Sequence, residues 1–187
     1  HRLLWPSDAL MRGANRAAEC FRRALVHDPG NNPGWRGDCL LNRAEALARC
    51  PMLDDLGLAW IEEPLVYDDL DGHAQLAAEL ATPIQIGENF YGPRDLADAL
   101  ARRACDLVMP DFMRIGGVTG WMRAAAIAGT ANVPISTHLY PEVAAHAMRV
   151  TPTAHWLEWQ DWIDPLLQRP YAVAQGAIEI PDVPGVG

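Results

Sequence analysis

The stretch "LAWIEEPL", residues 58–65, decides the fold, because an apolar run typical of a buried strand ends there on two carboxylates and a proline. Four more apolar runs follow it, and helical stretches rich in Ala, Leu and Arg separate them. The runs are "PIQIGE" (83–88), "DLVMPD" (106–111), "PISTHL" (134–139) and "HWLEW" (155–159). This alternation is typical of repeated βα units with a parallel sheet, and it predicts an α/β fold that is part of a (β/α) barrel.

Each predicted strand carries an ionisable residue at or near its end. These residues are Glu62, Glu88, Asp111, His138 and Glu158. In barrels of this kind the active-site residues lie at the C-terminal ends of the strands. Side chains two positions apart on a strand share a face. The sets that we expect to share a face are Ile84, Ile86 and Glu88; Met109 and Asp111; Ser136 and His138; and Trp156 and Glu158. The five ionisable groups should therefore meet at the barrel mouth.

The composition limits the classes of function. Half of the 187 residues are hydrophobic, so we expect one domain with a buried core. The net charge of -9 disfavours a nucleic-acid partner, because such binding depends on clustered basic residues. No apolar run approaches the roughly 18 residues of a membrane span, and no signal-peptide pattern is visible, so we expect a cytoplasmic protein without a membrane partner. All fifteen basic residues are Arg, which excludes a lysine base from this chain.

Two of the strand ends have the chemistry of a metal site. Glu62 and Glu88 lie one βα unit apart, and neighbouring carboxylates repel each other unless a cation lies between them. Mg²⁺ prefers such oxygen ligands, so we predict that both bind Mg²⁺. The alternative is that one is a ligand and the other a salt-bridge partner. Glu63 should point to the opposite face and contact a surrounding helix.

Two further strand ends have the chemistry of a catalytic base. Asp111 could orient His138 and stabilise its imidazolium, so that His138 accepts a proton near neutral pH. A lone His in a strand is more often a hydrogen-bonded core residue. Glu158 lies among tryptophans, a setting in which a neutral carboxylic acid could donate a hydrogen bond to a developing oxyanion. Together with a metal, these groups suit abstraction of a proton α to a carboxylate.

Six segments of the chain resemble one known family in the same order. They are "WIEEPL", "IGENFYGP", "MPDFMRIGGVTGW", "STHLYPEVAAH", "TPTAHWLE" and "IPDVPGVG". They resemble the C-terminal barrel of the enolase superfamily, and within it the mandelate racemase and muconate lactonizing enzyme family. The resemblance implies a TIM-barrel-like fold for residues 43–187. It also implies roles for five residues: Glu62 and Glu88 as the second and third Mg²⁺ ligands, Asp111 and His138 as the catalytic dyad, and Glu158 as the electrophilic acid.

The first part of the chain departs from the family pattern. A family member would carry a K-x-K pair and, about 26 residues before Glu62, a metal-binding Asp. The chain has no lysine, position 36 is Arg36, and Asp38 lies two residues late. We therefore expect residues 1–42 to be a divergent or truncated segment. Our hypothesis is truncation together with either a shifted reading frame or a divergent end. The expected barrel is incomplete and lacks the capping domain.

These observations lead to one leading interpretation and two alternatives. The leading interpretation is a mandelate racemase-like, Mg²⁺-dependent scaffold that removes the proton α to the carboxylate of a 2-hydroxy acid. One alternative is an inactive fragment that at most binds a divalent cation, and the other is an acid-sugar dehydratase with His138 as its single base. The expected partners are a small-molecule 2-hydroxy carboxylate or sugar acid, and further copies of the chain in a homo-oligomer, since an incomplete barrel exposes strand edges.

Overall fold

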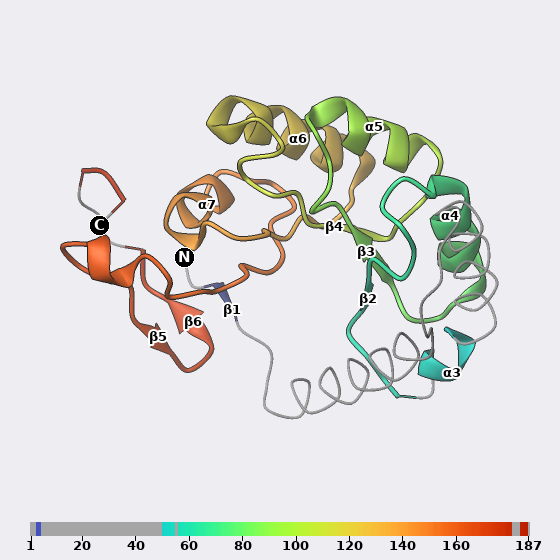
Figure 1. Cartoon of the computed structure of the whole chain (residues 1–187), viewed down its shortest axis with the longest axis horizontal. Coiled ribbons are helices and arrows are strands. Elements are labelled where there is room, and N and C mark those ends of the chain that lie inside the picture. The colour runs from blue at the N-terminus through green and yellow to red at the C-terminus, as the bar shows by residue number, and fades with distance from the viewer. Residues whose placement is uncertain (1–2, 5–49, 55, 181–183, 187) are drawn as a thin grey trace, which may run out of the picture.

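A short parallel sheet lies at the centre of the molecule (Figure 1). The computed structural model describes residues 3–4, 50–54, 56–180 and 184–186. The sheet contains β2 (Ile61–Glu62), β3 (Ile84–Ile86) and β4 (Leu107–Val108), side by side in chain order. Glu62 pairs with Gln85, and Gln85 pairs with Leu107. The prediction of successive parallel strands is confirmed for these three.

Two further segments extend the sheet without forming regular strands. Isolated parallel bridges join Val108 to Ile135 and Ile135 to Ala154. Between the segments at 134–139 and 155–159, side-chain hydroxyls accept two of the backbone hydrogen bonds. Ser136 Oγ accepts a hydrogen bond from the backbone N–H of Trp156, and Thr137 Oγ1 accepts one from Glu158. The predicted strands at 134–139 and 155–159 therefore occupy the expected places in the sheet but are irregular.

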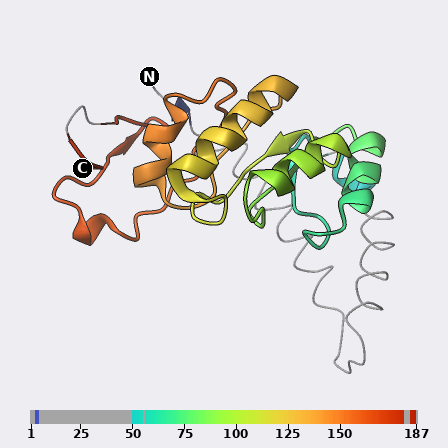
Figure 2. The same ribbon diagram turned by 90° about the horizontal axis from the view of Figure 1, so that it is seen from above.

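In the described part of the chain, four helices that follow the sheet segments cover the outer side of the sheet, and one short helix precedes β2 (Figure 2). Their bounds are α3 (Pro51–Asp54), α4 (Leu70–Glu79), α5 (Pro93–Ala101), α6 (Gly117–Ala131) and α7 (Pro141–Met148). The last four confirm the helical stretches expected from the sequence. A proline at the first position suits α5 and α7, because the N–H that proline lacks would have no partner within the helix.

The hydrophobic core lies between the sheet and these helices. Its most deeply buried large side chains include Leu76, Ile84, Ile86, Leu96 and Trp121, each at most 1% exposed. Ile84 and Ile86 come from β3, whereas the other three come from α4, α5 and α6. The apolar side chains of β3 therefore join the helix-facing core, which leaves its polar residue, Gln85, for the other face.

A second, antiparallel sheet brings the two ends of the chain together. It has the strand order β1 (Leu3–Leu4), β6 (Ala177–Ile178) and β5 (Val173–Ala174), and a short 3₁₀ helix η1 (Asp164–Leu166) precedes it. The sequence pattern did not predict this sheet. The prediction for residues 1–42 lies outside the described residues except at 3–4. Among the helices that the structure describes, none has the length and apolar character of a membrane span.

Candidate active site

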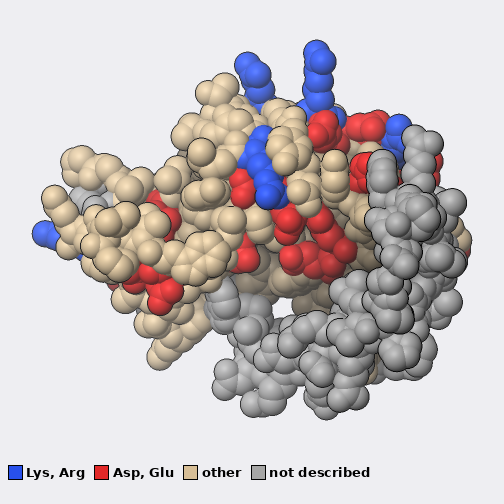
Figure 3. Space-filling view, viewed as in Figure 1, with Lys and Arg blue, Asp and Glu red and all other residues tan. Residues whose placement is uncertain are grey.

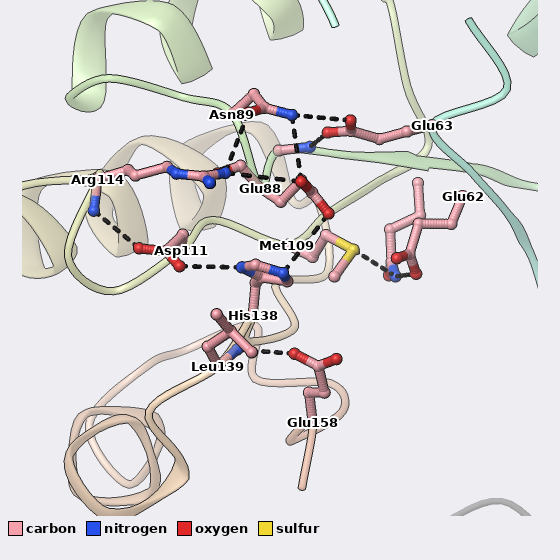
Figure 4. A network of polar contacts seen from close by, with 12 residues as sticks. Glu62, Glu63, Glu88, Asn89, Met109, Asp111, Arg114, His138, Leu139 and Glu158 are labelled. Carbon is pink, nitrogen blue, oxygen red and sulfur yellow. Dashed lines mark hydrogen bonds and ion pairs between the residues drawn. The ribbon is translucent and has the colours of Figure 1, made fainter. Parts of the chain in front are cut away.

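Asp111 and His138 form a hydrogen-bonded pair at the end of the sheet (Figure 4). A parallel bridge joins the two residues, which brings their side chains onto one face. His138 Nδ1 lies 2.9 Å from Asp111 Oδ2, and the Asp111 side chain is 4% exposed. The other Asp111 oxygen, Oδ1, accepts hydrogen bonds from the backbone N–H groups of Met113 and Arg114. Asp111 is thus fixed by its own loop, and it holds the imidazole so that Nε2 points away from it.

Glu88 lies beside the free nitrogen of that imidazole. His138 Nε2 is 3.5 Å from Glu88 Oε2. The guanidinium of Arg114 lies 3.6 Å from Glu88 Oε1, and its Nη1 donates to the backbone carbonyl of Glu88 and to Asn89 Oδ1. Arg114 therefore joins the loop after β3 to the loop after β4, and it brings positive charge to the carboxylate that faces His138.

The structure corrects the reason for which Glu88 was expected at the mouth. Ile84 and Ile86 are buried in the helix-facing core, so they do not share a face with Glu88. The strand ends at Ile86, and Gly87 has a φ of +140°, a conformation that glycine adopts readily. The chain turns at Gly87, and this turn, rather than strand alternation, directs Glu88 toward His138.

The prediction for Glu63 is wrong. Its side chain was expected to contact a helix, but it accepts hydrogen bonds from the backbone N–H of Gly87 and from Asn89 Nδ2. The backbone of Glu63 has a φ of +39°, which turns the residue toward the loop after β3. Burial, together with the charge of Glu88, raises the pKa of Glu63, although the hydrogen bonds from Gly87 and Asn89 oppose this rise.

Glu62 lies on the same side of the sheet, at the end of β2. Its Oε2 accepts hydrogen bonds from Trp60 Nε1 (3.2 Å) and from Gln85 Nε2 (3.3 Å). The side chain keeps an exposed face, but the protein around it displaces part of its water, and this burial raises the pKa of Glu62. The charges of Glu158 and Glu88 raise it further, whereas the two hydrogen bonds lower it. Glu62 thus lies close enough to Glu88 and Glu158 for their charges to act on it.

Glu158 completes the group of predicted residues. Its Oε2 accepts a hydrogen bond from the backbone N–H of Leu139 at 2.7 Å, and its own N–H is bonded to Thr137 Oγ1. Both bonds come from the segment that carries His138, so Glu158 is held next to the imidazole-bearing loop. The structure thus brings Glu62, Glu88, Asp111, His138 and Glu158 to one end of the sheet, where Figure 3 shows Asp and Glu side chains gathered on the surface.

The fit of these residues to a divalent cation is partial. Glu62 and Glu88 offer hard oxygen donors whose mutual repulsion a cation would relieve. Within residues 50–54, 56–180 and 184–186, however, no three His, Cys, Asp or Glu side chains are arranged to hold a metal ion together. The described residues therefore offer two candidate ligands, Glu62 and Glu88, rather than a closed site.

Several residues of the site were not selected from the sequence. Gln85, Asn89 and Arg114 all contact predicted site residues. A signal for Gln85 was present, because a single polar residue inside the apolar run "PIQI" needs a buried hydrogen-bond partner. Arg114 and Asn89 lie in loops, where no periodic pattern indicates the direction of a side chain.

Comparison with known proteins adds family evidence to this geometry. A family model described as "Enolase C-terminal domain-like" matches residues 16–187, and so begins upstream of residue 43. An enolase from alpha proteobacterium bal199, solved with bound Mg, is 66% identical, with a TM-score of 0.75 over 78% of this chain and 40% of that chain.

Two other relatives differ in the ligands or reactions that their names give. The L-talarate/galactarate dehydratase of Salmonella typhimurium is 34% identical over 78% of this chain and 37% of its own length. An enolase from Bradyrhizobium, solved in complex with magnesium and mandelic acid, is 32% identical with a TM-score of 0.72, over 95% of this chain and 57% of that chain. The chain thus spans well under two thirds of the length of each of these relatives.

Proposed function

Because the chain belongs to the enolase superfamily and carries the TIM-barrel-like scaffold of its racemases and dehydratases, we propose that it removes the proton α to the carboxylate of a sugar acid and that loss of water follows. Sugar-acid dehydratases are among the relatives, which favours dehydration over racemisation. The proposal concerns the part of the active site that this chain contains. The proposed substrate of this site is a 2-hydroxy carboxylate.

The pair of Asp111 and His138 is the single observation that carries the proposal. The carboxylate of Asp111 accepts the Nδ1–H of the imidazole at 2.9 Å, which leaves the lone pair on Nε2. Nε2 is then the atom that takes the α-proton, and the imidazolium that forms is stabilised by Asp111 on one side and by Glu88, 3.5 Å away, on the other. His138 acts as the base, and Asp111 and Glu88 stabilise the charge it gains.

Elimination needs only one base on the reacting face. His138 takes the proton from the α-carbon, a double bond forms between the α- and β-carbons as the hydroxyl leaves the β-carbon, and the same proton leaves with that hydroxyl as water. The enol that remains then tautomerises to the 2-keto acid. Racemisation requires a second group on the opposite face, and the chain has no lysine to provide it. The residues of this chain therefore suit dehydration better than racemisation.

Glu62 and Glu88 are the residues that would bind Mg²⁺. A bound Mg²⁺ would supply positive charge beside the substrate carboxylate and so increase the acidity of the α-proton. Glu158 has one oxygen bonded to Leu139, and we assign its other oxygen to the substrate, where Glu158 would act as the electrophilic acid. Solved relatives with bound magnesium support the choice of metal.

Proton exchange tests this proposal most directly. The purified chain is incubated with Mg²⁺ in D₂O, with galactarate, L-talarate and mandelate in turn, and the α-proton and any 2-keto product are followed by NMR. We expect exchange or dehydration of a sugar acid, its loss in His138→Asn, and a loss of roughly 100-fold or more in Asp111→Asn. Arg149→Gln, an exposed change on the C-cap of α7, serves as the control.

Three outcomes separate the candidate functions. Conversion of a sugar acid to a 2-keto acid supports the dehydratase. Inversion of mandelate at a rate similar to exchange would favour the mandelate racemase-like activity. No exchange on any substrate by a chain that circular dichroism shows to be folded would favour an inactive fragment that binds only the cation.

A further inference from the structure

Gln85 is buried directly beside Glu62. The two residues are paired in register across β2 and β3, and Gln85 is only 1% exposed. Gln85 Nε2 lies 3.3 Å from Glu62 Oε2 and 3.2 Å from the sulfur of Met109. Its Oε1 lies 3.3 Å from the hydroxyl of Ser136. Every polar atom of this buried amide therefore has a partner.

These contacts allow only one orientation of the amide. An ionised carboxylate only accepts hydrogen bonds, so the NH₂ group of Gln85 must face Glu62. The reversed amide would place the lone pairs of its oxygen against the carboxylate and against the sulfur of Met109. Because the oxygen of Gln85 then faces Ser136, the hydroxyl proton of Ser136 must point at Gln85.

The direction of the Ser136 proton also fixes the state of His155. With its single proton directed at Gln85, Ser136 Oγ can only accept from its other neighbours. These are the backbone N–H of Trp156 at 3.4 Å and His155 Nδ1 at 3.5 Å. His155 must therefore carry its proton on Nδ1. Burial lowers the pKa of His155, which favours a neutral ring whose single proton is then the one on Nδ1.

We propose that Gln85 is a positioning residue. Ser136 and His155 hold it in a hydrogen-bond relay, in which every donor points the same way and which ends on the Glu62 carboxylate. Each donor in the relay points toward Glu62: His155 to Ser136, Ser136 to Gln85, and Gln85 to Glu62. The relay holds Glu62 in one rotamer by directing the amide donor of Gln85 at its carboxylate. Its effect on cation binding rests on the proposed function, whereas its direction does not.

The direction of the relay is tested on the metal-free chain. The chain is labelled with ¹⁵N-histidine, and His155 is assigned by the signal lost in His155→Gln. We expect a neutral ring with the proton on Nδ1 in the wild type, and a mixture of the two tautomers in Ser136→Ala. A ring protonated on Nε2 in the wild type would overturn the proposal.

The positioning effect is tested by cation binding. Mn²⁺ is used as the probe, and free Mn²⁺ is counted by electron paramagnetic resonance. Gln85→Met keeps the length of the side chain and removes its amide, so we expect Mn²⁺ affinity to fall by roughly 10-fold to 100-fold, as for other residues that orient a ligand. Gln75→Met is the matched control, because Gln75 bonds Glu79 on the exposed face of α4.

The two proposals fail in different ways. Equal Mn²⁺ affinity in the wild type and in folded Gln85→Met would overturn the positioning role. A wild type that binds no Mn²⁺ would overturn the metal site of the proposed function and the role of the relay in cation binding, while the tautomer of His155 would still decide the direction of the relay.

Discussion

Arg114 shows how one side chain can hold two loops of a site together. It donates to the carbonyl of Glu88 and to Asn89, and its own N–H is bonded to Asp111. Arg114→Met removes the two side-chain hydrogen bonds, so we expect the free energy of unfolding to fall by about 1–3 kcal/mol and the rate of α-proton exchange to fall with it. Chemical denaturation and the exchange assay measure the two effects.

The control for this prediction is Arg123→Met. Arg123 is an exposed arginine on α6, away from the loops of the site. The substitution Arg123→Met should change the free energy of unfolding by less than about 0.5 kcal/mol. If both variants lose stability and exchange to the same extent, Arg114 has no special role in joining the loops.

His73 gives the stability of the fold a dependence on pH. Its side chain is fully buried, Nδ1 bonds the carbonyl of Asp69, and Nε2 has no hydrogen-bond partner among the residues that the structure describes. Burial lowers the pKa of His73, so the unfolded chain binds a proton near pH 6.5 that the folded chain resists. The stabilising contribution of neutral His73 is therefore present above about pH 6.5, the ordinary pKa of His, and is lost as the pH falls below it.

Replacement of His73 tests this dependence. His73→Gln cannot take up a proton, so its free energy of unfolding should fall less between pH 7 and pH 5 than that of the wild type. Urea denaturation at the two pH values measures the difference, with each variant compared with itself at pH 7. An equal fall in both proteins would show that His73 does not cause the pH dependence.

At the scale of the element, two glycines of α6 make opposite predictions. A Cβ added at Gly120 would overlap the carbonyl oxygen of Ile115, whereas one at Gly129 would meet only Pro152, at 3.7 Å. Gly120→Ala should therefore lower the free energy of unfolding by about 1–3 kcal/mol or more. Gly129→Ala should leave it unchanged or raise it by up to about 1 kcal/mol, because Ala favours the helix. Thermal denaturation of both variants compares them directly.

The elements also show what the sequence could and could not predict. The helices were predicted because their apolar residues recur with the period of a helix. The order of the strands was predicted because helices and strands alternate along the chain. Glu88 was assigned to the right place for the wrong reason, since the turn at Gly87 is not visible in an apolar pattern. Glu63 was misplaced because its positive φ reverses its direction. The pairing of β1 with β6 joins the two ends of the chain, and local patterns carry no information on such contacts.

At the scale of the whole molecule, the excess of carboxylates at the mouth predicts a response to cations. A ligand that binds only the folded chain stabilises it by about 2.7 kcal/mol at a hundredfold excess over its Kd. We expect Mg²⁺ at that excess to raise Tm by roughly 5–10 °C. In the double variant Glu62→Gln, Glu88→Gln the rise should vanish, because both candidate ligands have lost their charge.

Differential scanning fluorimetry checks this response. Glu79→Gln serves as the control, because Glu79 lies on α4 and bonds only Gln75 through its side chain in the described part of the chain. A Mg²⁺-dependent rise that persists in the double variant would place the cation elsewhere. The expected homo-oligomer stays a prediction, and sedimentation of the same samples tests it.

The antiparallel pairing of β1 and β6 decides how the molecule responds to mechanical force. Leu3 pairs with Ile178 and Leu4 with Ala177, so both ends of the chain leave the pair at the same side. A force applied between the two ends therefore unzips these pairs one after another, and each step breaks hydrogen bonds worth about 0.5–1.5 kcal/mol. Strands loaded in shear would have to break together. The small antiparallel sheet should thus unfold first, at low force, while the parallel sheet with its candidate active site remains folded.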